Sequence, residues 1–148
     1  MDDAGELFSL ANDDIVRRNS FSQGEIKWAE HLQWLSGKLS DDNCIFLVVS
    51  YSGKFAGQVR FDMAQLPNGA LINISLCKNV RGLGLSSLVI DRSIKEMLTM
   101  RRDVKFIRAY VKDENIPSAR AFAKAGFRFL ESTIIKGCKR RVYEKVVS

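Results

Sequence analysis

The part of the sequence best suited to chemistry is a glycine-bearing loop that joins a strand-like run to a long helical pattern. The run ends at Leu76, the loop holds Gly82 and Gly84, and the helical pattern starts at Leu85. The first amides of a helix lack intrahelical acceptors, and the helix dipole adds partial positive charge there. Because glycine has no Cβ, a phosphate group can approach the backbone closely. The context predicts a pyrophosphate site, to which Arg81 adds a charge-assisted contact.

The same glycines also suit a turn that serves packing alone, and their spacing leaves both interpretations open. Ser87 stands where the dinucleotide-binding fingerprint requires its third glycine. The loop also lacks the Gly-Lys-Ser/Thr sequence of a Walker motif. If the loop binds phosphate, it therefore belongs to neither of these classes.

A second segment with spaced polar and aromatic residues lies further along the chain. Ser118 and Phe122 follow Asn115 by three and seven residues, which places the three side chains on one face of a helix. Pro117 is tolerated in a first helical turn, and Gly126 favours a C-terminal stop. The segment predicts a short helix between two strands.

The elements that must position these residues alternate between helical and strand-like patterns. Periodicity predicts helices over Glu6–Ala11, Lys27–Leu39, Leu85–Met100 and Asn115–Ala125. Strand-like runs span Cys44–Ser50, Phe55–Asp62, Ala70–Leu76, Lys105–Val111, Phe127–Ile134 and Arg140–Val147. Turn signals lie at Ser52-Gly53, at Pro67-Asn68-Gly69 and at Gly137. This order predicts one α/β domain, residues 1–148, in which helices cover both faces of a mixed sheet.

Composition and charge limit the class of protein. The three cysteines form no CxxC pair and there is one histidine, so neither a disulfide framework nor a metal site is expected. The absence of a signal peptide or a bilayer-length apolar run favours a cytoplasmic protein. Residues 1–77 carry 6 Lys/Arg and 10 Asp/Glu, against 17 and 7 in residues 78–148. The basic half suits an anionic ligand or a solvated surface, and no nucleic-acid-binding motif accompanies it.

The two segments together resemble the signatures of the GNAT acetyltransferase superfamily. Arg81-Gly82-Leu83-Gly84-Leu85-Ser86 is similar to the family's Arg/Gln-x-x-Gly-x-Gly/Ala loop, with serine at the last position. Asn115 to Phe127 is similar to the family's Asn-x-x-Ser/Ala-x-x-x-Tyr/Phe-x-Lys-x-Gly-Phe helix. The resemblance implies a mostly antiparallel α/β (α+β) fold with a central sheet of about six to seven strands. The first strand is short or missing, which leaves a sheet edge for a second copy in a homodimer.

The resemblance also implies acetyl-CoA as the co-substrate and assigns contacts to it. The implied contacts are Leu76, Cys77, Lys78, Arg81, Gly82, Leu83, Gly84, Leu85, Ser86, Asn115, Ser118 and Phe122. Strand backbone near Leu76 would lie along the pantetheine arm and give an N–H to the developing oxyanion. Many family members carry a tyrosine at the position of Phe122 as the acid for the thiolate. Phenylalanine has no proton to give, so this role must lie elsewhere or be unnecessary.

Several side chains are candidates for moving protons. They are Asn73 and Ser75 on the strand before the loop, His31, Tyr143 and Tyr110, with Glu25 and Asp62 as further carboxylates. An asparagine cannot act as a base but can order a water. His31 lies beside an apolar helical stripe that starts at Trp28, so a packed histidine is the default expectation. The same spacing favours core positions for Trp28 and Trp34.

The first half of the chain resembles the GNAT branch that acetylates nucleotide-linked amino sugars, as in pseudaminic acid synthesis. The similar segments are Asn12–Phe21, Glu25–Trp34 and Gly57–Asp62. The branch implies a small-molecule amine as acceptor, a nucleotide sugar, with contacts from Arg17, Asn19, Ser20, Phe21 and Arg60. An arginine would meet the diphosphate and an aromatic ring would stack on the base or sugar. Alternatively, the arginines are solvated and the aromatic residues belong to the core.

Two other functions stay open on the sequence alone. One is acetylation of a protein N-terminus, as on a ribosomal protein, where the basic half would contact RNA. The other is a non-catalytic module that binds acetyl-CoA, which Phe122 and the lack of an obvious base would fit.

Overall fold

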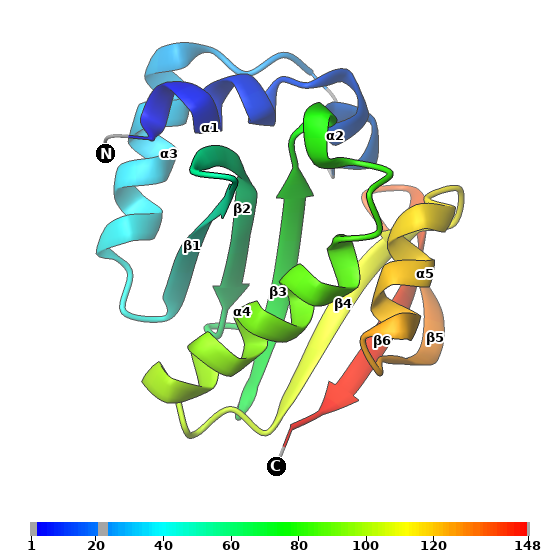
Figure 1. Cartoon of the computed structure of the whole chain (residues 1–148). Coiled ribbons are helices and arrows are strands. Elements are labelled where there is room, and N and C mark those ends of the chain that lie inside the picture. The colour runs from blue at the N-terminus through cyan, green and yellow to red at the C-terminus, as the bar shows by residue number, and fades with distance from the viewer. Residues whose placement is uncertain (1–2, 21–23, 148) are drawn as a thin grey trace.

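The structure, a computed structural model, is a six-stranded sheet with helices on both faces, and it describes residues 3–20 and 24–147. The helices are α1 (Ala4–Ala11), α2 (Asp14–Asn19), α3 (Trp28–Ser40), the 3₁₀ turn η1 (Lys78–Val80), α4 (Ser86–Met100) and α5 (Ile116–Lys124). The strands are β1 (Cys44–Tyr51), β2 (Lys54–Asp62), β3 (Gly69–Leu76), β4 (Phe106–Lys112), β5 (Arg128–Ile135) and β6 (Cys138–Val146). The strand order is β1-β2-β3-β4-β6-β5, and only β3 and β4 pair in parallel (Figure 1). The predicted fold class is confirmed, and no strand precedes α1 in the described residues.

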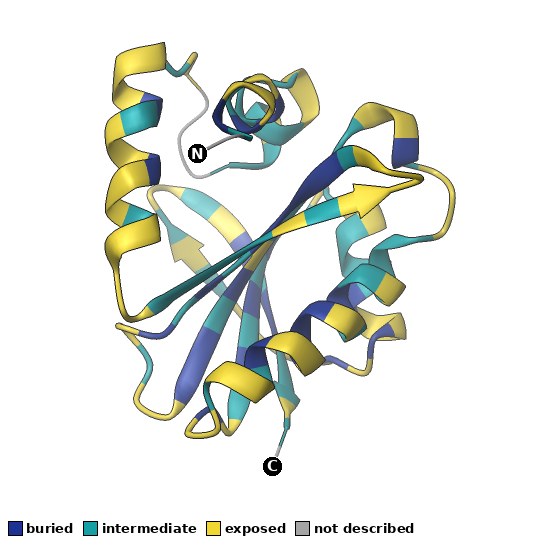
Figure 2. Cartoon of the chain, turned by 60° about the vertical axis from the view of Figure 1, so that its left-hand side comes forward, coloured by how far each residue is buried: buried dark blue, intermediate teal, exposed yellow. Residues whose placement is uncertain are grey.

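Alternation along the strands separates an apolar face from a polar face. Val59 and Phe61 of β2 pack into the main core under α4, and Figure 2 shows this buried layer along the strands. The intervening Gln58 and Arg60 point to the opposite face, which α1 and α3 cover. Successive strand side chains point to opposite faces, so the polar positions of neighbouring strands gather on one side. This alternation creates the polar wall of the site described below.

Each of the two long helices buries one face. In α4 the buried residues are Ile90, Ser93, Ile94 and Met97, at the spacing of one helix face, and Leu88 is exposed. In α3 the buried residues are His31 and Leu35, while Trp28 and Trp34 are 45% and 40% exposed. The prediction that both tryptophans are core residues was therefore wrong.

The hairpin turns agree with the predicted turn signals. Tyr51 pairs with Lys54, and Ile135 pairs with Cys138, so each turn has two residues. Both residues of each turn have positive φ, as in type I′ turns, which match the twist of the flanking strands. The register of β1 with β2 and of β5 with β6 is fixed locally in this way.

Strands β3 and β4 diverge soon after they pair. Their register covers only Gly69–Leu71 of β3 and Phe106–Arg108 of β4. Beyond these positions β3 stays paired with β2, and β4 stays paired with β6 (Figure 1). The sheet therefore opens between β3 and β4 toward the ends of both strands.

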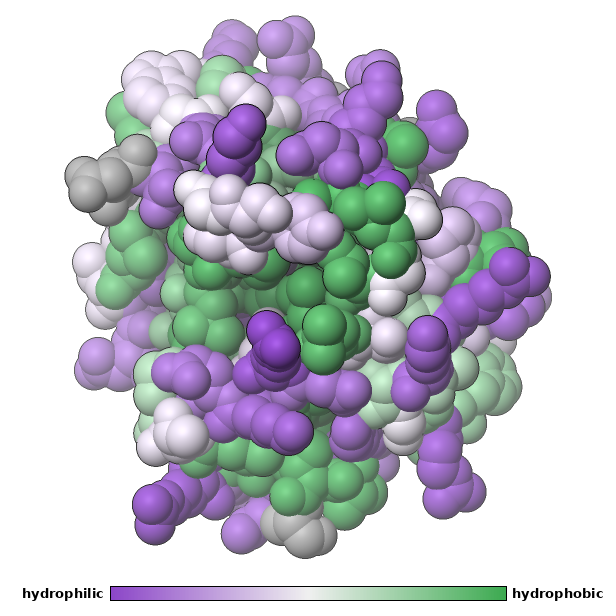
Figure 3. Space-filling model, viewed as in Figure 1, coloured by the Kyte–Doolittle hydropathy of each residue, from purple (hydrophilic) through white to green (hydrophobic). Residues whose placement is uncertain are grey.

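A shallow apolar groove lies between β1 and the start of α4. Its volume is about 430 Å³ and its wall includes Val48, Tyr51, Leu85, Leu88 and Val89. Figure 3 shows apolar side chains gathered in a hollow over this region. The groove faces away from the polar wall of β2 and β3.

The close packing of β2 on β3 gives a test of this fold. A Cβ at Gly57 would overlap the carbonyl oxygen of Ser75, which is backbone and cannot move aside. We expect Gly57→Ala to lower the free energy of unfolding by about 1–3 kcal/mol. Gly37→Ala, in α3 with nothing within 4 Å of the new Cβ, should raise it by about 0.5–1 kcal/mol. Chemical denaturation of both variants checks the pair, and equal effects would contradict the strand packing.

Candidate functional site

The opening between β3 and β4 continues as a cavity of about 410 Å³ that reaches α4 and α5. Of the predicted cofactor contacts, it is lined by Leu76, Arg81, Gly82, Ser86, Asn115, Ser118 and Phe122. These residues come from three separate parts of the chain, and the two sequence signatures meet in one cavity. We call this space the cofactor gap.

The backbone of β3 offers hydrogen-bonding groups to the cofactor gap. The amide of Cys77 donates to the carbonyl of Ala56 on the β2 side. Hydrogen bonding alternates along an antiparallel strand, so the N–H groups of Leu76 and Ile74 face away from β2. The direction of the Leu76 carbonyl agrees, since it accepts from Arg81 Nε at 2.9 Å. An extended chain in the gap can pair with these free backbone groups.

The N-terminus of α4 forms an open cradle at one end of the gap. Gly82 and Gly84 have φ of 78° and 72°, and a Cβ at either would meet nothing within 4 Å. The N-cap residue Leu85 makes no side-chain hydrogen bond to the helix. The amides of the first turn therefore remain available to an anion. The observed cradle fits a pyrophosphate.

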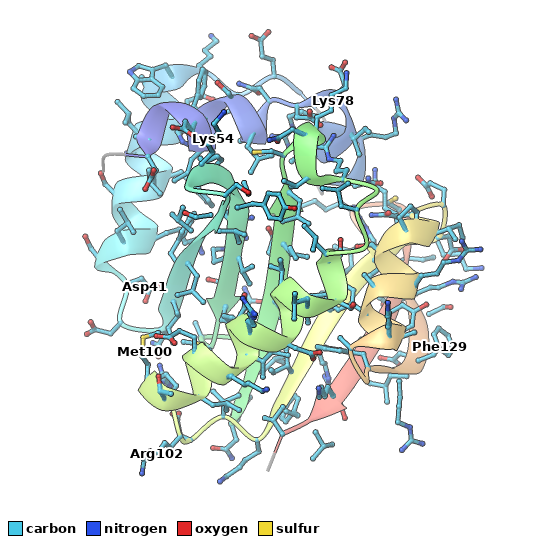
Figure 4. All side chains as sticks on the ribbon, viewed as in Figure 1. Asp41, Lys54, Lys78, Met100, Arg102 and Phe129 are labelled. Atoms are coloured by element: carbon cyan, nitrogen blue, oxygen red, sulfur yellow. The ribbon has the colours of Figure 1, made fainter. Side chains whose placement is uncertain are left out.

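Other predicted cofactor contacts have different positions. Leu85 packs its side chain against Ala56 and Val80. Leu83 is exposed. Cys77 and Lys78 line a separate depression beside α1, and Figure 4 shows Lys78 at that end of the molecule. Neither lines the cofactor gap, because the strand ends at Leu76 and η1 turns the chain toward α1.

Arg81 holds the loop rather than facing an open cradle. Besides the Leu76 carbonyl, it binds Asp13 through Nη2 at 2.9 Å. Asp13 also accepts hydrogen bonds from the amides of Ile15 and Val16 and so caps α2. The Asp13 carboxylate thereby joins the phosphate loop, residues 81–84 before α4, to the start of α2.

Helix α5 presents its signature residues to the gap. The Oδ1 of Asn115 accepts from the amide of Ser118, which caps the helix and leaves the Nδ2 donors outside the cap. At the other end, Gly126 donates to Ala123, and Phe127 donates to Phe122, as in a Schellman motif. The rings of Phe122 and Phe127 meet edge to face, with centroids 5.0 Å apart. Phe122 therefore belongs to the hydrophobic core and also lines the cofactor gap.

A second cavity, of about 460 Å³, lies between the polar face of the sheet and α1, α2 and α3. We call it the acceptor cavity. Its sheet wall consists of Gln58, Arg60, Asn73, Ser75 and Tyr110, with Arg140 beside them. These are the polar positions that strand alternation places on one face.

The two cavities meet. Residues that line both are Val16, Asn19, Ser20, Asn73, Ser75 and Tyr110. This junction, lined by the shared residues, lies where β3 and β4 have separated, so the two cavities are adjacent there.

Helix α2, absent from the sequence prediction, covers this junction. Its C-terminal carbonyls are bound by two buried cations. Lys112 Nζ donates to the Arg18 carbonyl, and Arg140 donates to the carbonyls of Asn19 and Ser20, each at 3.3 Å. Lys112 and Arg140 are direct partners across β4 and β6. The positive charges of Lys112 and Arg140 repel each other. The partial negative charge at the C-terminus of α2 offsets the free energy of this repulsion.

The acceptor cavity is rich in arginines and aromatic rings. Its wall carries Arg17, Arg60 and Arg140 against one carboxylate, Glu30. Arg60 pairs with Asp62 at 3.0 Å and lies over the ring of Trp34, 5.1 Å from the centroid. The predicted contacts Arg17, Asn19, Ser20 and Arg60 all line the cavity, whereas Phe21 lies outside the described residues.

His31 is a buried acceptor in the same cavity. It is 2% exposed and lies among the rings of Phe8, Trp28 and Trp34. Burial lowers the pKa of the ring, and a hydrogen bond to the backbone of Ala4 opposes this shift. The Nε2 atom has no partner among the described residues, so the bond to Ala4 uses Nδ1–H. The lowered pKa favours the neutral ring near pH 7, and Nε2 is then a buried acceptor without a partner among the described residues.

The structure separates the two tyrosines. Tyr110 lies at the junction of the cavities. Tyr143, predicted as a catalytic residue, is buried in the core, with its ring 5.9 Å from that of Phe129. It lines neither cavity, because its strand position faces the apolar side of the sheet. The carboxylates also lie elsewhere: Glu25 is outside both cavities, and Asp62 pairs with Lys38 and Arg60.

Sequence reasoning missed Gln58. Its side chain is 7% exposed, and its Nε2 donates to Asn73 Oδ1 at 2.8 Å. The signal was present, because Gln58 and Arg60 alternate with apolar residues and therefore share the face of Asn73 and Ser75.

Other features of the described residues bear on cofactors and location. Within residues 3–20 and 24–147, no cluster of three or more His, Cys, Asp or Glu is placed to hold a metal ion. None of the helices in this described part combines the length and apolar character needed to cross a bilayer.

The chain is similar to known acetyltransferases in sequence pattern and in fold. A model of the acetyltransferase (GNAT) family matches residues 8–127. No curated protein matches the sequence. The fold is similar to aminoglycoside acetyltransferase AAC(6')-Ib in complex with coenzyme A, with TM-score 0.82, 16% identity and coverage of 98% of this chain and 90% of that one.

Two further solved structures share the fold. Ribosomal-protein-alanine N-acetyltransferase from Brucella melitensis has TM-score 0.80 and 17% identity, covering 99% of this chain and 95% of that one. The self-immunity acetyltransferase MccE, in complex with acetyl-CoA and AMP, has TM-score 0.81 and 20% identity, covering 99% and 88%. At these identities the likeness shows the fold.

His31 gives a pH-dependent test of the site, since it is the only histidine. Burial lowers its pKa, so the unfolded chain binds this proton more tightly than the folded chain. The free energy of unfolding should therefore fall as the pH drops below about 6.5, the ordinary histidine value. In His31→Gln this fall should be absent between pH 7.5 and 5.5. Denaturation curves at several pH values check it, and equal slopes in both proteins would contradict the burial of a neutral ring.

Proposed function

The chain belongs to the acetyltransferase (GNAT) family, and we propose that it transfers the acetyl group of acetyl-CoA to the primary amine of a nucleotide-linked amino sugar. The single observation that carries the transfer is the junction of the two cavities at Asn73, Ser75 and Tyr110. A thioester in the cofactor gap and an amine in the acceptor cavity meet there without further movement. Both substrates then bind together, as direct attack requires.

The residues of the gap would hold the cofactor in three ways. The first-turn amides of α4, with Gly82 and Gly84, would bind the pyrophosphate. The outward N–H groups of β3 would pair with the pantetheine arm, and the amide of Leu76 would stabilise negative charge on the carbonyl oxygen. Asn115 would donate through Nδ2. Arg81 acts indirectly, because it fixes the loop through Leu76 and Asp13.

Direct attack fits the chemistry of the nearby nucleophiles. Burial raises the pKa of the Cys77 thiol, and Cys77 lines neither cavity. Ser75 Oγ lies 3.4 Å from Gln58 Nε2, which is a donor and cannot remove its proton. An acyl-enzyme therefore has no activated nucleophile at the junction. The amine itself attacks.

Proton transfer is assigned to two side chains of the acceptor cavity. The pKa of His31 is lowered by burial, which favours a neutral ring, and its Nε2 would take the proton from the amine through water. Tyr110 lies at the junction and would supply a proton to the thiolate, the role for which Phe122 is unsuited. Asn73 and Ser75 would order the amine and the relaying water. Tyr143 has no place in this scheme.

The composition of the acceptor cavity supports an anionic acceptor. Three arginines and one carboxylate line it, which disfavours a polycation such as a polyamine. Trp34, beside Arg60, offers a ring for a sugar or base. The fold also accommodates a nucleotide together with the cofactor in the MccE complex with acetyl-CoA and AMP. These features together favour a nucleotide sugar over a free amine.

The cradle assignment is tested by a charge placed in it. Gly84→Glu should abolish binding of coenzyme A in calorimetry, because a carboxylate would occupy the pyrophosphate position. Gly137→Glu is the matched control, since Gly137 has φ of 74° against 72° for Gly84 and equally open surroundings. The Gly137→Glu variant should bind coenzyme A with the affinity of the wild-type protein. Unchanged affinity in Gly84→Glu would refute the cradle.

The acceptor is tested by thiol release from acetyl-CoA with a panel of amines. The panel holds UDP-glucosamine, a UDP-4-amino sugar, free glucosamine, spermidine and alanine-terminated peptides. We expect kcat/KM for the better UDP-sugar to exceed that for free glucosamine at least about tenfold, because charge-assisted contacts to the diphosphate are lost in the free sugar. Release with peptides alone would favour protein acetylation. No release with any amine, despite cofactor binding, would favour a non-catalytic module.

A further inference from the structure

Gln58 has an environment that packing alone does not explain. Its side chain is 7% exposed, and its Oε1 has no hydrogen-bond partner among the described residues. A buried carbonyl oxygen without a donor destabilises the folded state. The side chain lines the acceptor cavity, so a shift of its amide on binding would bring Oε1 within reach of a donor on a bound molecule.

The orientation of Gln58 is fixed by the two polar residues at the junction. Its Nε2 donates to Asn73 Oδ1 at 2.8 Å and lies 3.4 Å from Ser75 Oγ. The side-chain amide of Gln58 is therefore fixed beside the place where the two cavities meet, with Nε2 toward Asn73 and Ser75. His31 Nε2 is the other buried acceptor of this cavity without a described partner, but it lies on α3 rather than on the sheet.

Resting on the function proposed above, we propose that Gln58 Oε1 accepts one N–H of the acceptor amine and makes the enzyme selective for primary amines. A neutral primary amine has two N–H bonds and one lone pair. With one N–H on Oε1, the amine is held beside Ser75 while its lone pair attacks the thioester carbon.

The atom balance of the transfer explains the selectivity. A C–N bond forms, the C–S bond breaks, and the sulfur leaves with the electron pair. One N–H proton goes to the base, and the product amide keeps the other N–H on Gln58 throughout. A secondary amine must lose its only N–H, and a hydroxyl must lose its only O–H. Either acceptor would leave Oε1 without a donor when the new bond forms, which a site built around a hydrogen bond strongly disfavours.

The experiment compares primary amines with their N-methyl derivatives. The ratio of kcat/KM is measured for a UDP-4-amino sugar, spermidine and an alanine-terminated peptide, each against its N-methyl form. In the wild-type enzyme we expect the ratio for the accepted amine to be at least about 100. A wild-type ratio near one would overturn the role of Gln58 without any variant.

Variants then separate the hydrogen bond from steric exclusion of the methyl group. In Gln58→Met, which keeps the length of the side chain, the ratio should fall at least about tenfold because the acceptor oxygen is gone. Gln33→Met, the same change at an exposed position of α3 outside both cavities, should leave the ratio unchanged. Coenzyme A affinity shows whether each variant has kept its fold.

Gln58→Glu provides a second signature. A carboxylate in place of Oε1 would favour the ammonium form of the bound amine, so the pH profile of kcat should move to higher pH. An unmoved profile, together with an unchanged ratio in Gln58→Met, would overturn the inference while the transferase function stands. Absence of turnover with every primary amine would instead overturn the function and this inference with it.

Discussion

The structure depends on the separation of β3 from β4. Parallel pairing stops at Leu71 and Arg108, although both strands continue. Backbone groups inside a protein need hydrogen-bond partners, so the open edge of β3 is stable only if a ligand, water or a neighbouring segment serves it. The gap thereby becomes a binding site for an extended chain, and the amides of α4 extend it to an anion. Every role assigned to the site follows from this opening.

Helix α2 lies over the gap between β3 and β4 and is held there by contacts at both of its ends. It is too short to be stable alone, and contacts far away in sequence hold both its ends. Asp13 joins its start to the phosphate loop through Arg81, and Lys112 and Arg140 hold its last carbonyls. Because Lys112 extends from β4, which borders the gap, and Arg140 from the neighbouring strand β6, α2 bridges the loop and the sheet. The acceptor cavity and the cofactor gap therefore share one wall.

The sequence predicted the elements that local patterns control. The hairpin turns, the helix that starts after Gly84 and the helix stop at Gly126 depend on neighbouring residues, and they agree with the structure. Helix α2 was missed because its stability comes from Arg81 and Lys112, which lie 68 and 94 positions from their partners. The buried side of α3 was misjudged because its packing against α1 decides it. Gln58 was predictable from the sequence, since strand alternation places its side chain on the same face as that of Arg60.

The central claim is that free amides along β3 and at the start of α4 bind the cofactor. Hydrogen exchange followed by NMR tests it most directly, with the amides of Leu76, Ser86 and Ser87 observed with and without coenzyme A. Saturating coenzyme A should slow exchange at these amides, while exchange at the amide of Cys77, already bonded to Ala56, should change little. Unchanged exchange at Leu76 and Ser86 in a chain saturated with coenzyme A would contradict it.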